Sequence, residues 1–412
     1  MSDYLIYCDD GCTQPLSCRK LSNGKYVLIR STVMGFGMVG EPETIVSEEY
    51  DDIRIYNDFY SPAYIFVKNH NSWGMFRYSI SVDYSNPKCS DYCGRFLLQK
   101  EKCCYSSLEE LERKYIRDSY EQVDEKSYRR TYNEYTPESW VKKFNKAKET
   151  GNYSELHGLR LDIYQDTKYA IKHNKYQLDG QEITLKTPGK SKYYSSEIKL
   201  GEGFDYDTQI LVLNEDCLKT AFDYKDENPL VLNMASRQQP GGGAESGAGA
   251  QEEYLFRTSN YAETLYPLRK CYPMDRNFGG IYSPSVTVFR GPEEEGYPFL
   301  KEPFVTNFVA VAALNRPAVN GECYANPAER QGMVNKVRTI LGIAAKNHHT
   351  VLILGAFGCG AFHNPASDVA RIFKEELESE TFKNRFEKVI FSIKSDHNDT
   401  QGNYSKFAEV FK

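Results

Sequence analysis

Apolar runs alternate with amphipathic segments along the chain from Leu156 onward. Five runs are almost continuously apolar, which is typical of strands buried on both faces: residues 209–214, 229–235, 304–313, 350–357 and 388–393. The segments between them carry apolar residues at helical spacing and predict three helices: residues 252–265, 329–347 and 366–379. This alternation predicts an α/β domain of three layers, α/β/α, around a mostly parallel or mixed sheet.

The first 155 residues follow other patterns. Residues 1–105 contain short segments of β-branched and aromatic residues separated by Asn, Gly and Pro, which predicts a small β-rich domain. Residues 106–155 mix charged and apolar residues at helical spacing around Pro137 and predict a helical connector. We therefore expect three parts: residues 1–105, 106–155 and 156–412.

Within the first part, Trp73-Gly74 and its flanking residues resemble the WG repeat, which forms β-hairpin arrays in bacterial proteins. The resemblance implies a module that binds a protein partner. A small β-domain that only packs on its neighbour is an equally good interpretation.

Composition narrows the class of protein. A length of 412 residues exceeds what one core usually organises, and a net charge of -6 argues against broad, nonspecific binding of nucleic acid. We recognise neither a secretory leader after Met1 nor an apolar stretch of membrane-spanning length, so we expect a cytoplasmic protein with reduced thiols and no membrane partner. Four of the 11 cysteines form two CxxxC pairs: Cys8, Cys12, Cys89 and Cys93. A structural zinc site is one interpretation of these pairs, but we favour ordinary thiols.

A glycine-rich loop follows the second predicted strand. Pro240 is followed by Gly241, Gly242 and Gly243, and three adjacent glycines are costly in backbone entropy. Close approach of backbone N–H groups to an anion or a sugar would explain them, although a flexible loop is the commoner reason. Because a ligand of such a sheet binds at the carboxyl ends of its strands, we interpret the loop as part of a binding site.

Two carboxylates, Glu252 and Glu253, open the helix after this loop. Acids favour helix N-termini through the helix dipole, which accounts for them without any function. Neighbouring helical side chains also diverge, so that one acid can reach a reacting centre while the other contacts a sugar hydroxyl. A carboxyl beside another acid is expected to have a raised pKa, which suits a general acid.

A second glycine-rich turn follows the strand that ends at Leu354. Gly355, Gly358 and Gly360 shape the turn, and Asn364 and Pro365 are predicted as N-cap and first residue of the next helix. Such a strand-to-helix turn suits a diphosphate. The turn is neither GxGxxG nor a Walker A loop, so a dinucleotide oxidoreductase and a nucleoside triphosphatase both lose support.

Three side chains of this turn carry candidate chemistry. Phe362 is our choice for a ring that orients a sugar, with core packing as the alternative. His363 is more often structural or exposed in such a position, and Cys359 is a nucleophile by residue type alone.

Together the two loops resemble the bacterial-type poly(ADP-ribose) glycohydrolases, a branch of the macrodomain fold. The signature is GGG, a spacer that here has seven residues, and QEE, and the resemblance extends over roughly residues 156–412. It implies a hydrolase that releases ADP-ribose by cleaving a ribose glycosidic linkage, without metal or cofactor. It implies Glu253 as the catalytic acid and base and Glu252 as the carboxylate that holds the ribose.

The resemblance also implies a set of residues that bind ADP-ribose: Asp216 at the adenine, Asn233 near the ribose, Gly241, Gly242, Gly243 and Gln251 in the first loop, and Gly358, Cys359, Gly360, Ala361 and Phe362 in the second. Ser236 stands where mono-ADP-ribosyl hydrolases of the macrodomain fold have a second asparagine, so the chemistry is expected to depend on the glutamate. The implied partner is ADP-ribose or poly(ADP-ribose) on a modified macromolecule. A non-catalytic ADP-ribose reader and a hydrolase of ADP-ribosylated nucleic acid remain the alternatives.

Overall fold

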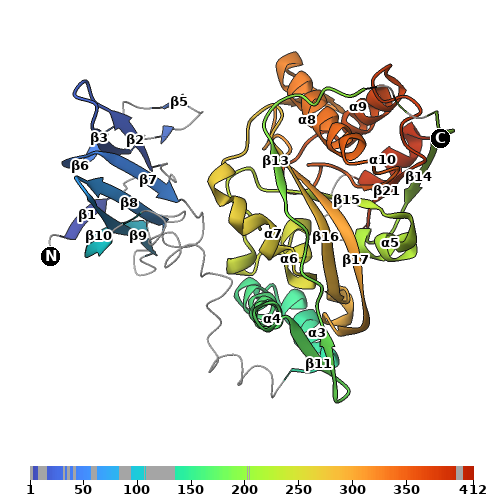
Figure 1. The fold of residues 1–412 in the computed structure, drawn as a ribbon, viewed down its shortest axis with the longest axis horizontal. Helices are drawn as coiled ribbons and strands as arrows, with labels where there is room; N and C mark the ends of the chain where they lie inside the picture. The colour runs from blue at the N-terminus through green and yellow to red at the C-terminus, as the bar shows by residue number, and fades with distance from the viewer. Residues whose placement is uncertain are drawn as a thin grey trace. The chain divides into compact units, whose positions relative to one another are not determined.

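The computed structural model of the chain describes residues 3–7, 16–30, 33–34, 38–39, 43–56, 63–82, 94–105, 107, 135–201, 203, 205–395 and 402–412 (Figure 1). The chain divides into two compact units, Met1–Gln122 and Val123–Lys412. The four cysteines considered for zinc and the predicted helical residues 108–122 lie outside the described residues.

The first unit consists of antiparallel strands, as its β-branched and aromatic composition predicts. Five strands form one sheet in the order β1-β10-β9-β8-β7, three form a second in the order β2-β3-β6, and β4 pairs with β5. Leu28, Ile53, Ile65 and Phe76 belong to the apolar core of this unit. The bounds of its strands are β1 Asp3–Tyr7, β2 Leu16–Lys20, β3 Tyr26–Arg30, β4 Val33–Met34, β5 Met38–Val39, β6 Glu43–Tyr50, β7 Asp52–Tyr56, β8 Ala63–Asn69, β9 Ser72–Val82 and β10 Gly94–Tyr105.

The second unit is built on a seven-stranded mixed sheet with the order β13-β16-β17-β15-β20-β21-β14. Neighbours from β17 to β14 are parallel, whereas β16 is antiparallel to both β17 and β13. Its strands are β13 Lys192–Tyr194, β14 Gln209–Leu213, β15 Leu230–Met234, β16 Gly280–Arg290, β17 Phe299–Val311, β20 Val351–Leu354 and β21 Lys388–Ser392. Two small hairpins lie outside the sheet: β11 Lys175–Leu178 with β12 Gln181–Thr184, and β18 Val319–Asn320 with β19 Cys323–Tyr324.

Helices cover both faces of this sheet (Figure 1). The α-helices of the unit are α3 Pro137–Glu149, α4 Tyr153–His173, α5 Cys217–Asp223, α6 Gln251–Thr258, α7 Ala262–Leu265, α8 Pro327–Lys346, α9 Ala366–Glu378 and α10 Asn403–Val410. Short 3₁₀ helices span Lys225–Glu227, Ala244–Ser246, Tyr266–Cys271 and Glu293–Glu295. The three predicted layers and the mixed sheet are therefore confirmed.

Alternation along β15 shows how the sequence orients the sheet. Leu230 and Leu232 lie in the core cluster that also contains side chains of α8 and α9. Asn233, one position out of phase, points to the other face and donates hydrogen bonds to residues of α6 and of the segment before α7. This period of two places a polar side chain at the end of an otherwise apolar strand, on the α6 side of the sheet.

The structure departs from the predicted elements in two places. The sheet has two strands beyond the five predicted, β13 and β16. Residues of β16 alternate between apolar and polar, so this strand lacks the continuous apolar run that predicted the other five. The single helix predicted over 252–265 is wrong: Ser259 has extended backbone and forms a bridge with Val288, which separates α6 from α7. Helix α4 contains residue 156, and α3 packs on α4 through Trp140 and Phe144; the expected domain boundary at this residue stays a prediction.

Candidate active site

Both glycine-rich loops lie at the same edge of the sheet, because β15 and β20 are adjacent and parallel. The first loop, residues 235–250, joins β15 to α6, and the second loop, residues 355–365, joins β20 to α9. A Cβ on Gly355 would lie 3.7 Å from Cε of Met234, so the two loops leave the sheet side by side. The segment after β14, which carries Asp216, leaves from this edge as well.

Gln251 fixes the start of α6 against β15. Its amide oxygen accepts from the backbone N–H of Met234 at 2.9 Å, and its amide nitrogen donates to the carbonyl of Leu232 at 2.7 Å. Both ends of the side chain thereby bind strand backbone. The contacts within the protein make Gln251 a positioning residue for the two acids that follow it, and its predicted contact with ADP-ribose stays a prediction.

Glu252 is buried and held by three N–H groups. One carboxylate oxygen accepts from the backbone of Ser236 at 2.6 Å, and the other accepts from the backbone of Gly241 at 3.1 Å and the amide of Asn233 at 3.3 Å. Burial and the neighbouring charge of Glu253 raise the pKa of Glu252 to about 8, although these hydrogen bonds oppose the shift. Glu252 thus links the first loop to the end of β15. A raised pKa was expected for one acid of the pair, and Glu252 is the acid that has it.

Glu253 is also buried but is held through one oxygen only. Its Oε1 accepts from the backbone N–H of Gly243 at 2.8 Å. Its Oε2 is buried and has no hydrogen-bond partner among the described residues. A buried, unpaired carboxylate oxygen is costly in a folded protein, so such atoms are expected at sites that bind or react.

The three glycines of the first loop are packed against the protein itself. A Cβ on Gly242 would overlap Oε1 of Glu253 and lie 3.1 Å from Oε2 of Glu252. A Cβ on Gly241 would overlap the ring of Phe256, and one on Gly243 would lie 2.7 Å from Cβ of Ala248. Gly242 also has a φ of 53°, where other residues are strained. The glycines therefore let backbone approach the two carboxylates, and the flexible-loop interpretation does not account for this packing.

Helix α4 supports the rest of the first loop. A Cβ on Gly249 would overlap the guanidinium of Arg160, and one on Gly247 would overlap the carbonyl of His157. Lys168 pairs with Glu245 at 2.8 Å, and Arg160 pairs with Glu293 at 2.8 Å. The small residues between the glycines and QEE are thus required for packing on α4.

The second loop contrasts with the first. A Cβ on Gly358, where φ is 75°, would lie 2.5 Å from Cβ of Ala313, whereas a Cβ on Gly360 would meet no atom within 4 Å. Cys359 is fully buried in the core cluster, and burial of this kind speaks against a nucleophile. Ala361 is exposed, and Phe362 is half-buried with part of its ring packed on the core cluster.

The predicted helix cap at Asn364 is wrong by one residue. Pro365 is the N-cap of α9, and Asn364 is buried just before it. The amide of Asn364 donates to the carbonyls of Leu314 and Gly358, and its oxygen accepts from Tyr324. Its side chain therefore holds the second loop in shape and does not satisfy the free N–H groups of the helix.

Asn233 and Asp216 lie at this edge of the sheet too. Asn233 is fully buried; it donates to Glu252 and to the hydroxyl of Tyr261, while its Oδ1 has no partner among the described residues. Asp216 caps α5 by accepting from the N–H groups of Leu218 and Lys219, and burial raises its pKa. The predicted contacts of both residues with the ribose and the adenine stay predictions.

Sequence reasoning missed Tyr272, in the segment before β16. Its hydroxyl is buried and has no partner among the described residues, and the charge of Glu252 contributes to raising its pKa after the larger effect of burial. A tyrosine between Cys271 and Pro273 gives no sequence signal of its own. Only the fold brings its hydroxyl within electrostatic reach of Glu252.

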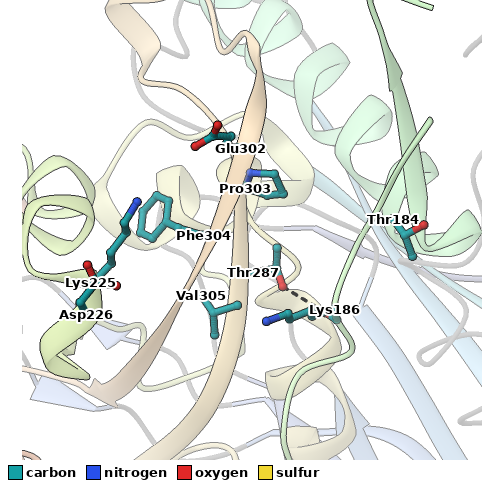
Figure 2. Close-up of a pocket in the computed structure, with 9 residues that line it drawn as sticks. All are labelled: Thr184, Lys186, Lys225, Asp226, Thr287, Glu302, Pro303, Phe304 and Val305. Carbon is teal, nitrogen blue, oxygen red and sulfur yellow. Dashed lines mark hydrogen bonds between the residues drawn. The ribbon is translucent and has the colours of Figure 1, made fainter. Parts of the chain in front are cut away.

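A separate cavity of 360 Å³ lies beyond the amino ends of β15 and β17, away from both loops (Figure 2). Its lining is Thr184, Lys186, Lys225, Asp226, Thr287, Glu302, Pro303, Phe304 and Val305. Thr287 donates to the carbonyl of Lys186, and the ammonium of Lys225 lies 4.2 Å from the ring centroid of Phe222. None of the predicted site residues lines this cavity.

Two absences hold for the described part of the chain. No group of three or more His, Cys, Asp or Glu side chains there is arranged to hold a metal ion. No helix within those ranges is both long and apolar enough to cross a membrane.

Comparisons with known proteins include a family match that contains the first loop and α6. Residues 143–291 match the family described as microbial-type PARG, catalytic domain. A poly(ADP-ribose) glycohydrolase structure from Thermomonospora curvata is 26% identical, with a TM-score of 0.52 over 61% of this chain and 99% of that chain. The same enzyme bound to the inhibitor ADP-HPD gives 26% identity and a TM-score of 0.50, over 61% and 98% of the two chains.

A poly(ADP-ribose) glycohydrolase from Deinococcus radiodurans in complex with ADP-ribose is 30% identical, with a TM-score of 0.43 over 50% of this chain and 85% of that chain. No curated protein matches the chain.

Proposed function

The chain belongs to the microbial-type poly(ADP-ribose) glycohydrolases, and from this membership we propose that Glu253 performs the cleavage at the edge of the sheet described above. The protein is a glycosidase that hydrolyses the ribose glycosidic linkage of poly(ADP-ribose). What we add is the assignment of roles to its own residues.

One observation carries the assignment to Glu253. Of the two adjacent acids, Glu252 has both oxygens engaged by three N–H groups, whereas Glu253 has one oxygen engaged and Oε2 buried without a partner among the described residues. A general acid must bring a carboxyl oxygen within hydrogen-bond reach of the leaving oxygen. Oε2 of Glu253 is the oxygen of the pair that is left for this contact.

The proposed reaction uses Glu253 twice. At neutral pH the pair of acids carries one proton. In the proposed reaction this proton lies on Glu253, whose carboxyl donates it to the leaving oxygen as the bond to the anomeric carbon of the ribose breaks. The oxocarbenium-like ribose is stabilised by the negative charge of its own diphosphate. The carboxylate of Glu253 then takes a proton from water as that water attacks the anomeric carbon, which restores the acid and completes the hydrolysis.

The other predicted residues position the substrate in this proposal. Adenine lies beside Asp216, the diphosphate lies between the two loops, and the ribose lies over Asn233 and Glu252. Support comes from Gly360, where nothing stands within 4 Å of a would-be Cβ, and from the unpaired buried Oδ1 of Asn233. Both features suit a ligand that approaches backbone and side chain closely.

Release of ADP-ribose from a poly(ADP-ribosyl)ated protein tests the role of Glu253. Glu253→Gln keeps the shape of the side chain but removes the acid, so kcat should fall by at least ~10²–10⁴-fold, the usual contribution of general acid–base catalysis. Affinity for ADP-ribose should remain, which shows that the variant is folded. Glu302→Gln, in the cavity of Figure 2, serves as the matched control and should retain full activity.

Equal rates for wild type and Glu253→Gln would exclude the assignment. Binding of ADP-ribose by the wild type without turnover of any ADP-ribosylated substrate would instead identify a reader.

A further inference from the structure

The order of strands at the site's edge gives a direction to the substrate. From β14 inward the order is β14, β21, β20, β15, and then β17 and β16. In the proposed function, adenine lies at the end of β14, the diphosphate at β20 and the ribose at β15. The leaving side of the scissile bond therefore lies beyond β15, over the end of β17 and the start of β16. The following inference rests on that proposed placement.

Two chain segments meet on this leaving side. Ser236, whose N–H binds Glu252, is followed by Arg237, and the carbonyl of Arg237 accepts from the backbone N–H of Met274 at 2.9 Å. Residues 272–279 lead directly into β16 at Gly280. Arg237 is thus one residue from a contact of the reacting pair, and the segment beside it carries a second arginine, Arg276.

Arg237 lacks a partner for one of its donors. It is half-buried, and its Nε is buried without a hydrogen-bond partner among the described residues. Burial and, after it, the positive charge of Arg276 lower the pKa of Arg237. A guanidinium that is partly desolvated beside a like charge is stabilised by a bound anion.

The nearby carboxylate of Asp275 partly offsets this repulsion through its charge, but it makes no hydrogen bond to Nε of Arg237. Its Oδ1 accepts from the backbone N–H groups of Asn277 and Phe278, both at 2.8 Å. The ammonium of Lys336 is also in this region and donates to the carbonyl of Asp275 at 2.9 Å. Three basic residues, Arg237, Arg276 and Lys336, therefore share a single nearby acid, and one of its two carboxylate oxygens is engaged by backbone.

We propose that Arg237 and Arg276 bind the diphosphate of the adjoining ADP-ribose unit, on the leaving side of the scissile bond. Paired guanidinium groups suit this ligand because each presents several N–H donors in a fixed plane to phosphate oxygens. The subsite makes a polymer of ADP-ribose the preferred substrate, since a single ADP-ribose group attached to a protein brings no second diphosphate.

Binding to the full chain with Glu253→Gln, which removes turnover, tests the subsite. The probes are ADP-ribose, a two-unit ADP-ribose oligomer and an ADP-ribosylated DNA oligonucleotide. The oligomer should bind more tightly than ADP-ribose. Arg237→Gln should lower the affinity for the oligomer by roughly tenfold, as expected for loss of a charge-assisted contact to phosphate. ADP-ribose itself should bind unchanged, and Arg276→Gln should act in the same direction with a smaller effect because it is exposed.

Two controls separate this subsite from general charge effects. Lys301→Gln removes one positive charge at the exposed start of β17 and should leave the affinity for the oligomer unchanged. Arg237→Lys keeps the charge and should recover part of the affinity. In the catalytically intact chain, Arg237→Gln should raise KM for poly(ADP-ribose) while kcat stays within about twofold. The difference in KM between wild type and Arg237→Gln should become smaller at high salt.

The subsite is overturned if Arg237→Gln leaves the affinity for the oligomer unchanged. It is also overturned if the variant lowers the affinity for ADP-ribose by the same factor, or lowers only the affinity for the DNA probe. These outcomes are distinct from failure of the proposed function, in which the wild type releases no ADP-ribose from the polymer whatever stands at position 237.

Discussion

The two glycine-rich loops follow neighbouring parallel strands, yet their glycines serve different contacts. In the first loop, a Cβ on any glycine from Gly241 to Gly243 would collide with or crowd protein atoms, among them the carboxylates of Glu252 and Glu253. In the second loop, a Cβ on Gly360 would extend into open space. The first loop is packed against the two acids, whereas the second loop leaves open space at Gly360, where the proposed function places the ligand.

A glycine run can be required by packing within the protein itself, before any ligand binds. The first loop is held by Glu252, which accepts from the backbone of Gly241, and packs through Gly249 on Arg160 of α4. The geometry of Glu253 is thus set in advance, which is how an enzyme keeps a catalytic carboxyl in position at little cost during the reaction.

Gly242→Ala should break this arrangement most severely. The added Cβ overlaps Oε1 of Glu253, and the positive φ of 53° disfavours alanine, so the carboxylate or the loop must move. A displacement of about 1 Å can lower kcat by ~10²-fold, and we expect a loss of this size in release of ADP-ribose.

Gly321→Ala is the matched control for that variant. Gly321 also has a positive φ, 59°, but a Cβ there meets no atom within 4 Å. The control should show comparable backbone strain in thermal unfolding and normal activity. A loss of activity in both variants alike would mean that strain, and not contact with Glu253, explains the effect at Gly242.

The buried acid of the first loop predicts how stability depends on pH. The pKa of Glu252 is about 8 in the folded chain and near the ordinary 4.5 when unfolded, so the folded state binds more protons between these values. The free energy of unfolding should therefore fall as pH rises from about 4.5 to 8 because of this group, and level off above. Denaturant unfolding of wild type and Glu252→Gln across this interval measures the contribution as the difference in slope.

Glu302→Gln, an exposed acid at the start of β17, should leave the wild-type slope intact. A slope that is the same in Glu252→Gln as in wild type would show that Glu252 is not protonated in the folded chain.

Gly360→Ala should have the smallest effect on the protein and a selective effect on the ligand. Because the second loop leaves open space at this residue, the melting temperature should not change. A methyl group directed toward the diphosphate should lower the affinity for ADP-ribose by roughly tenfold, as measured in a binding titration. Unchanged affinity would mean that the diphosphate does not approach this residue.

Much of the second unit could be predicted from hydrophobic pattern, because its central strands are buried on both faces and give continuous apolar runs. The edge strand β13 and its neighbour β16 were missed. In β16 the reason is that the alternating residues of GIYSPSVTV give no such run. The break between α6 and α7 was missed for another reason: the extended backbone of Ser259 is set by pairing with Val288, a contact distant in sequence.

The sequence singles out the candidate acids of the site but not their contacts. The signature identified Glu252 and Glu253, but only the fold shows that three N–H groups hold the first and one holds the second. Arg237 and Tyr272 gave no pattern, because their relevance comes from segments that meet only in space. The WG-repeat likeness, a protein partner of the first unit, the expected division into three parts and a cytoplasmic location stay predictions.

The most direct measurement is a crystal structure of Glu253→Gln with ADP-ribose bound. The account predicts that the diphosphate lies between residues 241–243 and 358–362, and that the side chain of residue 253 lies within hydrogen-bond reach, about 2.6–3.2 Å, of the oxygen on the anomeric carbon of the distal ribose. A nucleotide bound with its ribose out of reach of residue 253, or bound away from both loops, would contradict it.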